Sequence, residues 1–251
     1  MKSRRVLRAT TLALLPALVA SACGAVGAPA GQATIVRDQA VVAFRGEIDV
    51  ASSQRLVAEL RPSDTLRIRS DGGLRSAAVV VGQAVITQGA TVEVNGRCFS
   101  ACALYVALPA PRVSVGEGST LLFHSTPAIW RRAIGERPEL FSESERRRIL
   151  AEADWLKAAL VARGIDPAIL DCIDRATGAD LSAIQESPGP LSDRPLIPMR
   201  FSFAWLSPQV LAHFGARNIQ ADWVVAPEAR ESYETFQNQR IAWVDDPADC
   251  Q

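Results

Sequence analysis

A serine, a histidine and a pair of glycines are spaced along the first half of the sequence in a way that could support nucleophilic catalysis. Ser100 lies in the stretch GRCFSACAL, between two cysteines and at the expected start of a helix rich in small residues. His124 ends the apolar run TLLFH, and Gly72 and Gly73 end the run RSDGG. A histidine next to a serine can act as its general base, and backbone N–H groups at a glycine turn can stabilise an oxyanion.

Each of these features alone also has a structural explanation. A serine at the start of a helix often caps it, and paired glycines often form a tight turn that requires a positive φ angle. A histidine at the end of a strand or helix is commonly structural, and His213 in VLAHFG fits that description. The chemical interpretation depends on the order in which the glycines, Ser100 and His124 occur together.

The predicted elements place all three features at one edge of a sheet. Strands are predicted over 41–48, 65–70 and 91–96, and helices over 51–60, 74–89 and 99–108. Such alternation is typical of βαβ units with parallel strands and right-handed crossovers. Because the carboxyl ends of parallel strands meet at one edge, we expect His124 to reach Ser100 there, and the N–H of Ala101 to be a second oxyanion donor.

The remainder of the chain is predicted to be mainly helical. Residues 112–125 read as one or two strands separated by a glycine turn, and residues 126–141 read as irregular. Ser142 or Ser144 is a plausible N-cap for a long helix that ends at Gly164. The predicted helices cover 142–164, 166–178 and 207–216, and a proline-rich loop covers 187–200.

The N-terminus has the pattern of an export signal. Basic residues in MKSRRVLR precede the apolar run ATTLALLPALVA, and the small residues ASA precede Cys23. This order is similar to a bacterial lipobox, in which the chain is cut before the cysteine and the cysteine is lipidated; ordinary cleavage after Ala22 or Ala30 is the alternative. We therefore expect a signal peptide over 1–22, a tether over 23–39, a folded domain over 40–230 and a tail over 231–251. The expected location is the periplasm, with a membrane anchor if Cys23 carries lipid.

Cysteine usage fits an oxidising compartment. The five cysteines are Cys23, Cys98, Cys102, Cys172 and Cys250, so lipidation of Cys23 leaves an even number. Four cysteines allow three pairings, among them Cys98–Cys102, which would brace the turn at Ser100, together with Cys172–Cys250, which would tie down the C-terminus. We expect no metal, because no histidine lies close in sequence to a cysteine. Lysine plus arginine and aspartate plus glutamate both number 27, and no basic block points to nucleic acid.

Several stretches resemble the proteolytic subunit of the Clp protease, in the Clp-protease/crotonase superfamily. The stretch LRIRSDGG is similar to that family's IxSPGG, GRCFSACAL to the GxAASMGA around its nucleophile, and LLFH to the xMIH that carries its histidine. Further similarity runs through TGADLSAIQES and FAWLSPQVLAHFGARN, so that the resemblance covers roughly residues 41–225. It implies an α/β fold, a spiral of βαβ units with a mainly parallel sheet and a helical C-terminal part. It also implies a serine peptidase acting on peptides or proteins without a cofactor, with Ser100 as nucleophile and His124 as base. The SAC sequence and the export signal look most like exported bacterial relatives.

The sequence departs from the family at the third catalytic position. Ser187 stands where the family has its aspartate, with Glu186 adjacent and Asp193 nearby as carboxylates that could orient His124. A catalytically inactive binding or scaffold protein of the cell envelope is therefore the main alternative, and an acyl-CoA enzyme of the crotonase type is a third. Family members form rings, so the resemblance implies a homo-oligomer, although no residue here demands one.

Overall fold

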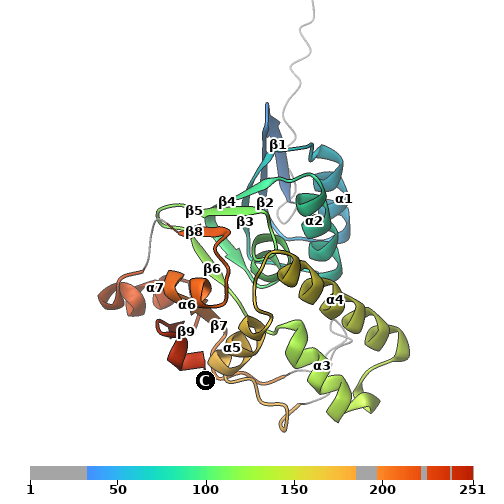
Figure 1. Cartoon of the computed structure of the whole chain (residues 1–251), viewed down its shortest axis with the longest axis vertical. Helices are drawn as coiled ribbons and strands as arrows, with labels where there is room; N and C mark the ends of the chain where they lie inside the picture. The colour runs from blue at the N-terminus through green and yellow to red at the C-terminus, as the bar shows by residue number, and fades with distance from the viewer. Residues whose placement is uncertain (1–32, 185–196, 222–224, 238, 251) are drawn as a thin grey trace, which may run out of the picture.

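A mainly parallel sheet forms the centre of the computed structural model, which describes residues 33–184, 197–221, 225–237 and 239–250 (Figure 1). Its strands run in the order β1-β2-β3-β4-β5-β8, and β6 pairs with β4 as well. Only the β1–β2 pairing is antiparallel among these strands. The strands are β1 (Thr34–Asp38), β2 (Val41–Arg45), β3 (Thr65–Ser70), β4 (Thr91–Phe99), β5 (Arg112–Val115), β6 (Thr120–Leu122) and β8 (Ile219–Ala221).

Three successive crossovers cover one face of this sheet. They contain α1 (Val50–Glu59), α2 (Arg75–Thr87) and the π-helical segment η1 (Cys102–Ala107). Alternate strand residues such as Phe44, Ile68 and Val94 point into this layer and join one core with the helices. Because βαβ units repeat along the chain, the predicted α/β class with a mainly parallel sheet is confirmed.

The opposite face of β2, β3 and β4 carries polar side chains. Arg45, Arg67, Arg69 and Asn95 are all exposed on it, whereas their strand neighbours are buried on the helical side. This alternation is the period of two that a strand imposes when only one of its faces is packed.

Strands β5 and β6 are consecutive in sequence and both lie parallel to β4. Strand β5 pairs with Thr91–Val94 at the start of β4, and β6 pairs with Arg97–Phe99 at its end. After the turn at Gly118 the chain therefore continues in the same direction, at a position further along β4. This step brings residue 123 and its successors next to the end of β4.

The helical part lies beside the ends of the strands, in the lower right of Figure 1. It contains α3 (Pro127–Glu136), α4 (Glu143–Ala162) and α5 (Ala168–Thr177), with a short 3₁₀ turn η2 (Pro138–Leu140) between the first two. Of the two serines that the sequence offers as N-cap of α4, Ser142 takes that role. Gly178 ends α5 in the left-handed conformation.

Residues 126–141 are not irregular, which corrects the sequence-based expectation. Thr126 accepts a hydrogen bond from the Ala128 amide and Pro127 occupies the first turn, so that α3 has a regular start. Ile129, Ala133 and Ile134 are buried in a separate cluster with α4. Residues spaced in this way lie on one side of a helix and form an apolar stripe.

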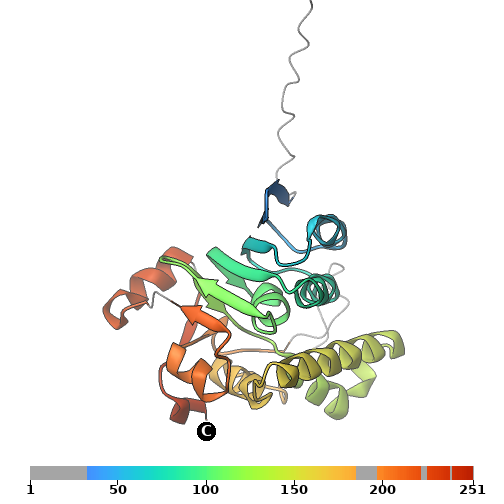
Figure 2. The same ribbon diagram turned by 45° about the horizontal axis from the view of Figure 1, so that its top comes forward.

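Two boundaries of the expected domain organisation also change. Strand β1 lies within the expected tether of 23–39, and β9 (Ile241–Val244) lies within the expected tail of 231–251. Strand β9 pairs in parallel with β7 (Phe203–Leu206) in a second sheet of two strands. Helices α6 (Pro208–His213) and α7 (Arg230–Gln237) and the 3₁₀ turns η3 (Pro227–Ala229) and η4 (Pro247–Cys250) complete this region, seen at the lower left of Figure 2.

Strands β1 and β9 are short, as are β7 and β8, which the sequence patterns also do not predict. Strand β1 is an edge strand with no buried residue, so it lacks an apolar alternation. Strand β9 is an isolated apolar run, and its partner lies far away in sequence.

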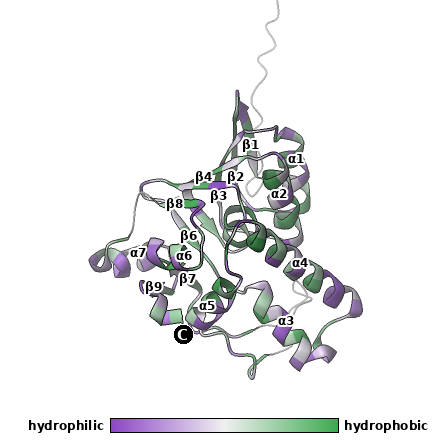
Figure 3. Cartoon of the chain, in the orientation of Figure 1, coloured by the Kyte–Doolittle hydropathy of each residue, from purple (hydrophilic) through white to green (hydrophobic). Residues whose placement is uncertain are grey.

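The hydropathy colouring of Figure 3 shows green residues concentrated in the sheet and the helices next to it. Within the part of the chain that the structure describes, none of the helices has the length and apolar character needed to cross a bilayer.

Candidate active site

Ser100 stands at a sharp turn between β4 and η1. Its φ angle is +54°, a left-handed conformation that non-glycine residues seldom adopt. The Ser100 amide donates to the Leu122 carbonyl at 2.9 Å, and the Ser100 carbonyl accepts from the Leu104 amide at 3.0 Å. The backbone of Ser100 is therefore fixed on both sides, so that its side chain leaves the end of the sheet in a defined direction.

A disulfide spans this turn. Cys98 at the end of β4 is bonded to Cys102 at the start of η1, and both residues are fully buried. A second disulfide joins Cys172 of α5 to Cys250 in η4. Four cysteines allow three pairings, and the structure contains Cys98–Cys102 together with Cys172–Cys250. The first bond braces the turn at Ser100, and the second holds the C-terminal segment.

His124 approaches Ser100 from the chain that follows β6. Its neighbour Phe123 exchanges two backbone hydrogen bonds with Ala204 of β7, at 2.9 and 2.7 Å. The His124 ring packs against Phe203, with 4.6 Å between the ring centroids. The His124 Nε2 atom then lies 2.6 Å from Ser100 Oγ, so the two side chains share a hydrogen bond.

Burial controls the electrostatics of His124. Loss of hydration lowers the pKa of the imidazole from 6.5 to about 4, because the charged form is disfavoured away from water. The ring is therefore neutral near pH 7, with one nitrogen that accepts and one that donates. When Nε2 of the neutral ring accepts a hydrogen bond from the Ser100 hydroxyl, the single ring proton is on Nδ1. This Nδ1 atom is buried and has no hydrogen-bond partner among the described residues.

The glycine pair packs directly against Ser100. A Cβ atom on Gly72 would lie 2.8 Å from the Ser100 Cβ and 3.1 Å from the Ala101 amide nitrogen. Gly72 has a φ of +104° and Gly73 a φ of +139°, so the turn requires glycine for its conformation as well as for space.

The two glycine amides differ in their surroundings. The Gly72 amide donates to the Ser70 hydroxyl at 3.1 Å. Gly73 lies beside Ile48, but the bonds of that pairing involve the Gly72 carbonyl and the Leu74 amide, at 2.8 Å each. The Gly73 N–H consequently points away from Ile48, and we find no acceptor for it among the described residues.

The carboxylates proposed to orient His124, Glu186 and Asp193, lie outside the described residues. Asp174 is the buried carboxylate near this region, and it accepts hydrogen bonds from the Thr126 amide at 3.1 Å and the Thr126 hydroxyl at 2.6 Å. Burial raises the pKa of Asp174 to about 6, although these hydrogen bonds oppose the shift. Asp174 therefore holds the start of α3 in place rather than contacting His124.

A cavity of about 400 Å³ opens beside His124. Arg200 and Arg240 both stand over the Phe201 ring, with 5.3 and 5.5 Å to its centroid. No sequence pattern predicts a role for these residues, because a lone aromatic next to an arginine occurs in many structural settings. The lining residues are His124, Met199, Arg200, Phe201, Ser202, Phe203, Gln239 and Arg240.

Cys23 lies outside the described residues. Within the described part of the chain, no group of three or more His, Cys, Asp or Glu side chains is arranged to hold a metal ion.

Comparison with known proteins gives a likeness in structure but none in sequence. No family model and no curated protein matches the sequence. Among the solved structures, the chain is similar to a point mutant of ClpP1 from Listeria monocytogenes, at 14% sequence identity and a TM-score of 0.35. The superposition covers 84% of this chain and 94% of that one.

Proposed function

We propose that this chain is an exported serine hydrolase of the peptidase type and a distant relative of the Clp-protease/crotonase superfamily. The observation that carries the proposal is the 2.6 Å separation between Ser100 Oγ and His124 Nε2. The residues of the pair come from two different strand ends of one parallel sheet, where active sites of such sheets commonly lie.

In the proposed reaction, Ser100 Oγ attacks the carbonyl carbon of a peptide bond while His124 Nε2 takes its proton. The carbonyl oxygen becomes an oxyanion that accepts hydrogen bonds from backbone amides. Of the expected donors, Gly73 and Ala101 fit better than Gly72, whose amide already donates to Ser70. His124 then passes the proton to the leaving amine, and a water deprotonated by the same nitrogen hydrolyses the Ser100 ester.

The buried Nδ1 of His124 favours a third participant. An N–H buried without an acceptor is costly, and a carboxylate at this position would both accept the bond and stabilise the imidazolium. We propose that Glu186 or Asp193 supplies it. Glu186→Gln and Asp193→Asn, tested separately, should show which one slows reaction at Ser100.

The unpartnered Nδ1 of His124 is also the observation that favours the second candidate function, a catalytically inactive envelope protein that binds a partner. If no carboxylate reaches Nδ1, the low pKa of about 4 makes His124 a weak base. Ser100 would then have no efficient activation, and the cavity beside His124 would serve binding only.

A fluorophosphonate probe separates the two functions. The wild-type chain should become labelled at Ser100, located by mass spectrometry of the modified peptide, and His124→Gln should be labelled at least about a hundredfold more slowly. Ser100→Ala should not be labelled at all, while its unfolding transition stays cooperative. Ser207→Ala is the matched control and should still be labelled at Ser100. Ser207 is a helix N-cap, and its hydroxyl donates a hydrogen bond to the Asp245 carbonyl. Absence of label on wild-type Ser100 would exclude the hydrolase and leave the binding protein.

A further inference from the structure

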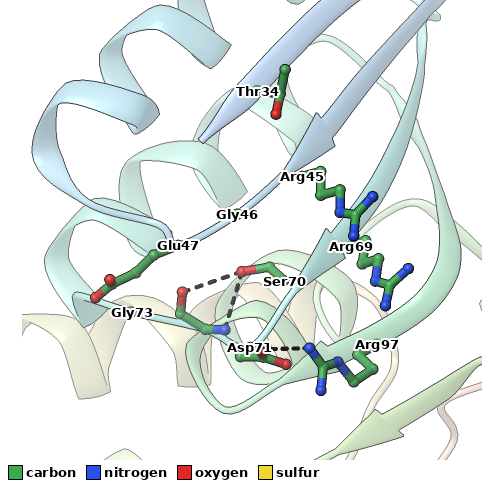
Figure 4. A pocket seen from close by; sticks show the side chains of 10 residues that line it. Thr34, Arg45, Gly46, Glu47, Arg69, Ser70, Asp71, Gly73 and Arg97 are labelled. Atoms are coloured by element: carbon green, nitrogen blue, oxygen red, sulfur yellow. Dashed lines mark hydrogen bonds and ion pairs between the residues drawn. The ribbon is translucent and has the colours of Figure 1, made fainter. Parts of the chain in front are cut away.

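A cavity of about 580 Å³ lies at the carboxyl ends of β2, β3 and β4, on the face of the sheet without helices (Figure 4). Gly72 and Gly73, in the turn between β3 and α2, form part of its wall. Since Gly72 is packed against Ser100, the cavity adjoins the proposed reaction centre. The lining residues are Thr34, Arg45, Gly46, Glu47, Arg69, Ser70, Asp71, Gly72, Gly73 and Arg97.

Three arginines from three neighbouring strands line this cavity. Arg45 of β2 and Arg69 of β3 are paired in register, and like charges on facing positions of neighbouring strands repel each other. Both side chains are exposed, and neither has a salt bridge or hydrogen bond to another described side chain. The sheet therefore carries an adjacent pair of guanidinium groups that an anion would stabilise.

The carboxylates in the cavity wall do not neutralise this pair. Asp71 forms an ion pair with Arg97 at 3.0 Å. Figure 4 shows Glu47 pointing away from the arginines, whereas Arg45 and Arg69 extend to the same side as Arg97. Arg45 and Arg69 therefore line the cavity without a carboxylate next to them.

The distance from these arginines to Ser100 suits an extended peptide. Neighbouring strands lie about 4.8 Å apart, so Arg69 and Arg45 are one and two strand spacings from β4, which leads into Ser100. Ser70 pairs with Cys98, so Ser100 also lies about three residues, or roughly 10 Å, further along the sheet than Arg69. The backbones of Arg69 and Arg45 are therefore about 11 and 14 Å from that of Ser100, which an extended chain advancing about 3.3 Å per residue spans with roughly three to four residues.

We propose that Arg45 and Arg69 bind a carboxylate of the peptide substrate and so select acidic peptides. The inference rests on the proposed peptidase function for the class of ligand, whereas the charge pair itself does not depend on catalysis. A planar guanidinium fork matches a carboxylate with two parallel hydrogen bonds, and two forks on adjacent strands can hold one carboxylate or two successive ones. The carboxylate comes from an acidic side chain or from the C-terminus of the peptide.

Binding to the full-length Ser100→Ala chain tests this without turnover. Fluorescein-labelled decapeptides of alanine, serine and glycine carry either three central Glu or three central Gln residues, and each is made with a free or an amidated C-terminus. The Glu peptide should bind about tenfold or more tightly than the Gln peptide, by fluorescence anisotropy, and this preference should weaken as NaCl is raised. A preference for the free C-terminus instead would identify the terminal carboxylate as the ligand.

Arg45→Gln/Arg69→Gln should abolish the preference, and Arg69→Glu should shift it towards a matched Lys peptide. The charge-matched control is Arg112→Gln/Arg163→Gln, which removes two exposed positive charges elsewhere on the molecule and should retain the preference. Thermal unfolding of each variant checks that it is folded.

Two results would overturn the proposal: equal affinity for all four peptides, or a preference that survives Arg45→Gln/Arg69→Gln in a folded chain. Failure of the hydrolase function is a separate result, because it is measured as absent fluorophosphonate labelling of wild-type Ser100. If acidic peptides bind but wild-type Ser100 is not labelled by the fluorophosphonate, the arginine site is supported and the peptidase function is excluded.

Discussion

At the level of single residues, Ser100 combines a polar side chain with a conformation that favours glycine. A residue with a Cβ atom pays about 1 kcal/mol or more in the left-handed region. At Ser100 this conformation is held by the hydrogen bond to Leu122 and by the disulfide that spans the turn. A strained backbone at a position that also contacts a histidine is typical of functional sites.

Replacing Ser100 with glycine should therefore stabilise the fold relative to replacing it with alanine. Both variants lack the hydroxyl, so both lose the bond to His124 and the fluorophosphonate reaction. Glycine adopts a φ of +54° without strain. Ser100→Gly should therefore have a free energy of unfolding about 1 kcal/mol larger than that of Ser100→Ala, seen as a higher midpoint in denaturant unfolding. If alanine proved as stable as glycine, the strain assigned to this turn would be absent.

His124 should make stability depend on pH in the acidic range. Its pKa is about 4 in the folded chain and near 6.5 when exposed, so the unfolded chain binds the extra proton between these values. Stability contributed by the neutral ring is complete above pH 6.5 and is lost as the pH falls towards 4, by up to about 3 kcal/mol. Asp174, with a pKa raised to about 6, acts in the opposite direction over much of the same range.

A comparison with His124→Gln isolates the histidine, because both chains retain Asp174. Urea unfolding at pH 7 and at pH 4.5 should show a larger loss of stability in the wild-type chain than in the variant. Equal losses in the two chains would mean that His124 titrates normally in the folded state.

At the level of elements, the turn from β4 into η1 shows what the sequence can and cannot predict. The strand, the following helix and the approach of His124 follow from apolar periodicity and from the geometry of parallel strands. The π-helical form of η1 does not, because it depends on packing: Gly82 of α2 allows the Tyr105 carbonyl to approach where a Cβ would stand only 2.0 Å away.

Other elements escaped prediction for physical reasons that differ from case to case. Helix α3 has local signals, Thr126 and Pro127, and an apolar stripe, but it is only 10 residues long, and Gly135 and Pro138 near its end favour irregular structure. The arginine pair across β2 and β3 requires knowledge of strand register, and Arg45 and Arg69 stand 24 positions apart in the printed sequence. Single-sequence patterns report local periodicity, whereas register and long-range pairing are set by the assembled core.

The two disulfides should have separable effects. Closing a loop of about five residues, as Cys98–Cys102 does, stabilises a fold by about 2 kcal/mol in the chain-entropy model, and closing one of about 79 residues, as Cys172–Cys250 does, by about 4.5 kcal/mol. Cys98→Ser/Cys102→Ser should therefore lose less stability but slow fluorophosphonate labelling of Ser100, because the turn becomes free to relax. Cys172→Ser/Cys250→Ser should lose more stability and label at nearly the wild-type rate below its melting temperature. Labelling that slowed equally in both variants would mean that the first bond has no special relation to Ser100.

At the level of the whole molecule, the two disulfides bear on the proposed location. The long-range bond ties α5 to η4, and therefore joins the helical part to the chain that follows β9. Structural disulfides persist in oxidising compartments such as the bacterial periplasm. This requirement is independent of the export pattern in residues 1–22, and the two considerations support the same proposed location.

We expect lipid to be attached at Cys23 once the signal peptide has been removed. The small residues before Cys23 and the tether of small and polar residues after it fit this processing, and a lipid there would hold the folded domain at the membrane surface. Radiolabelled palmitate supplied to bacteria that produce the full chain should enter the wild-type protein and not Cys23→Ser. Cys102→Ser is the matched control, because it removes a cysteine in the folded domain and should keep the label. Equal labelling of wild type and Cys23→Ser would remove the lipid anchor, and an unlabelled wild-type protein recovered from the periplasm would instead support ordinary cleavage after Ala22 or Ala30.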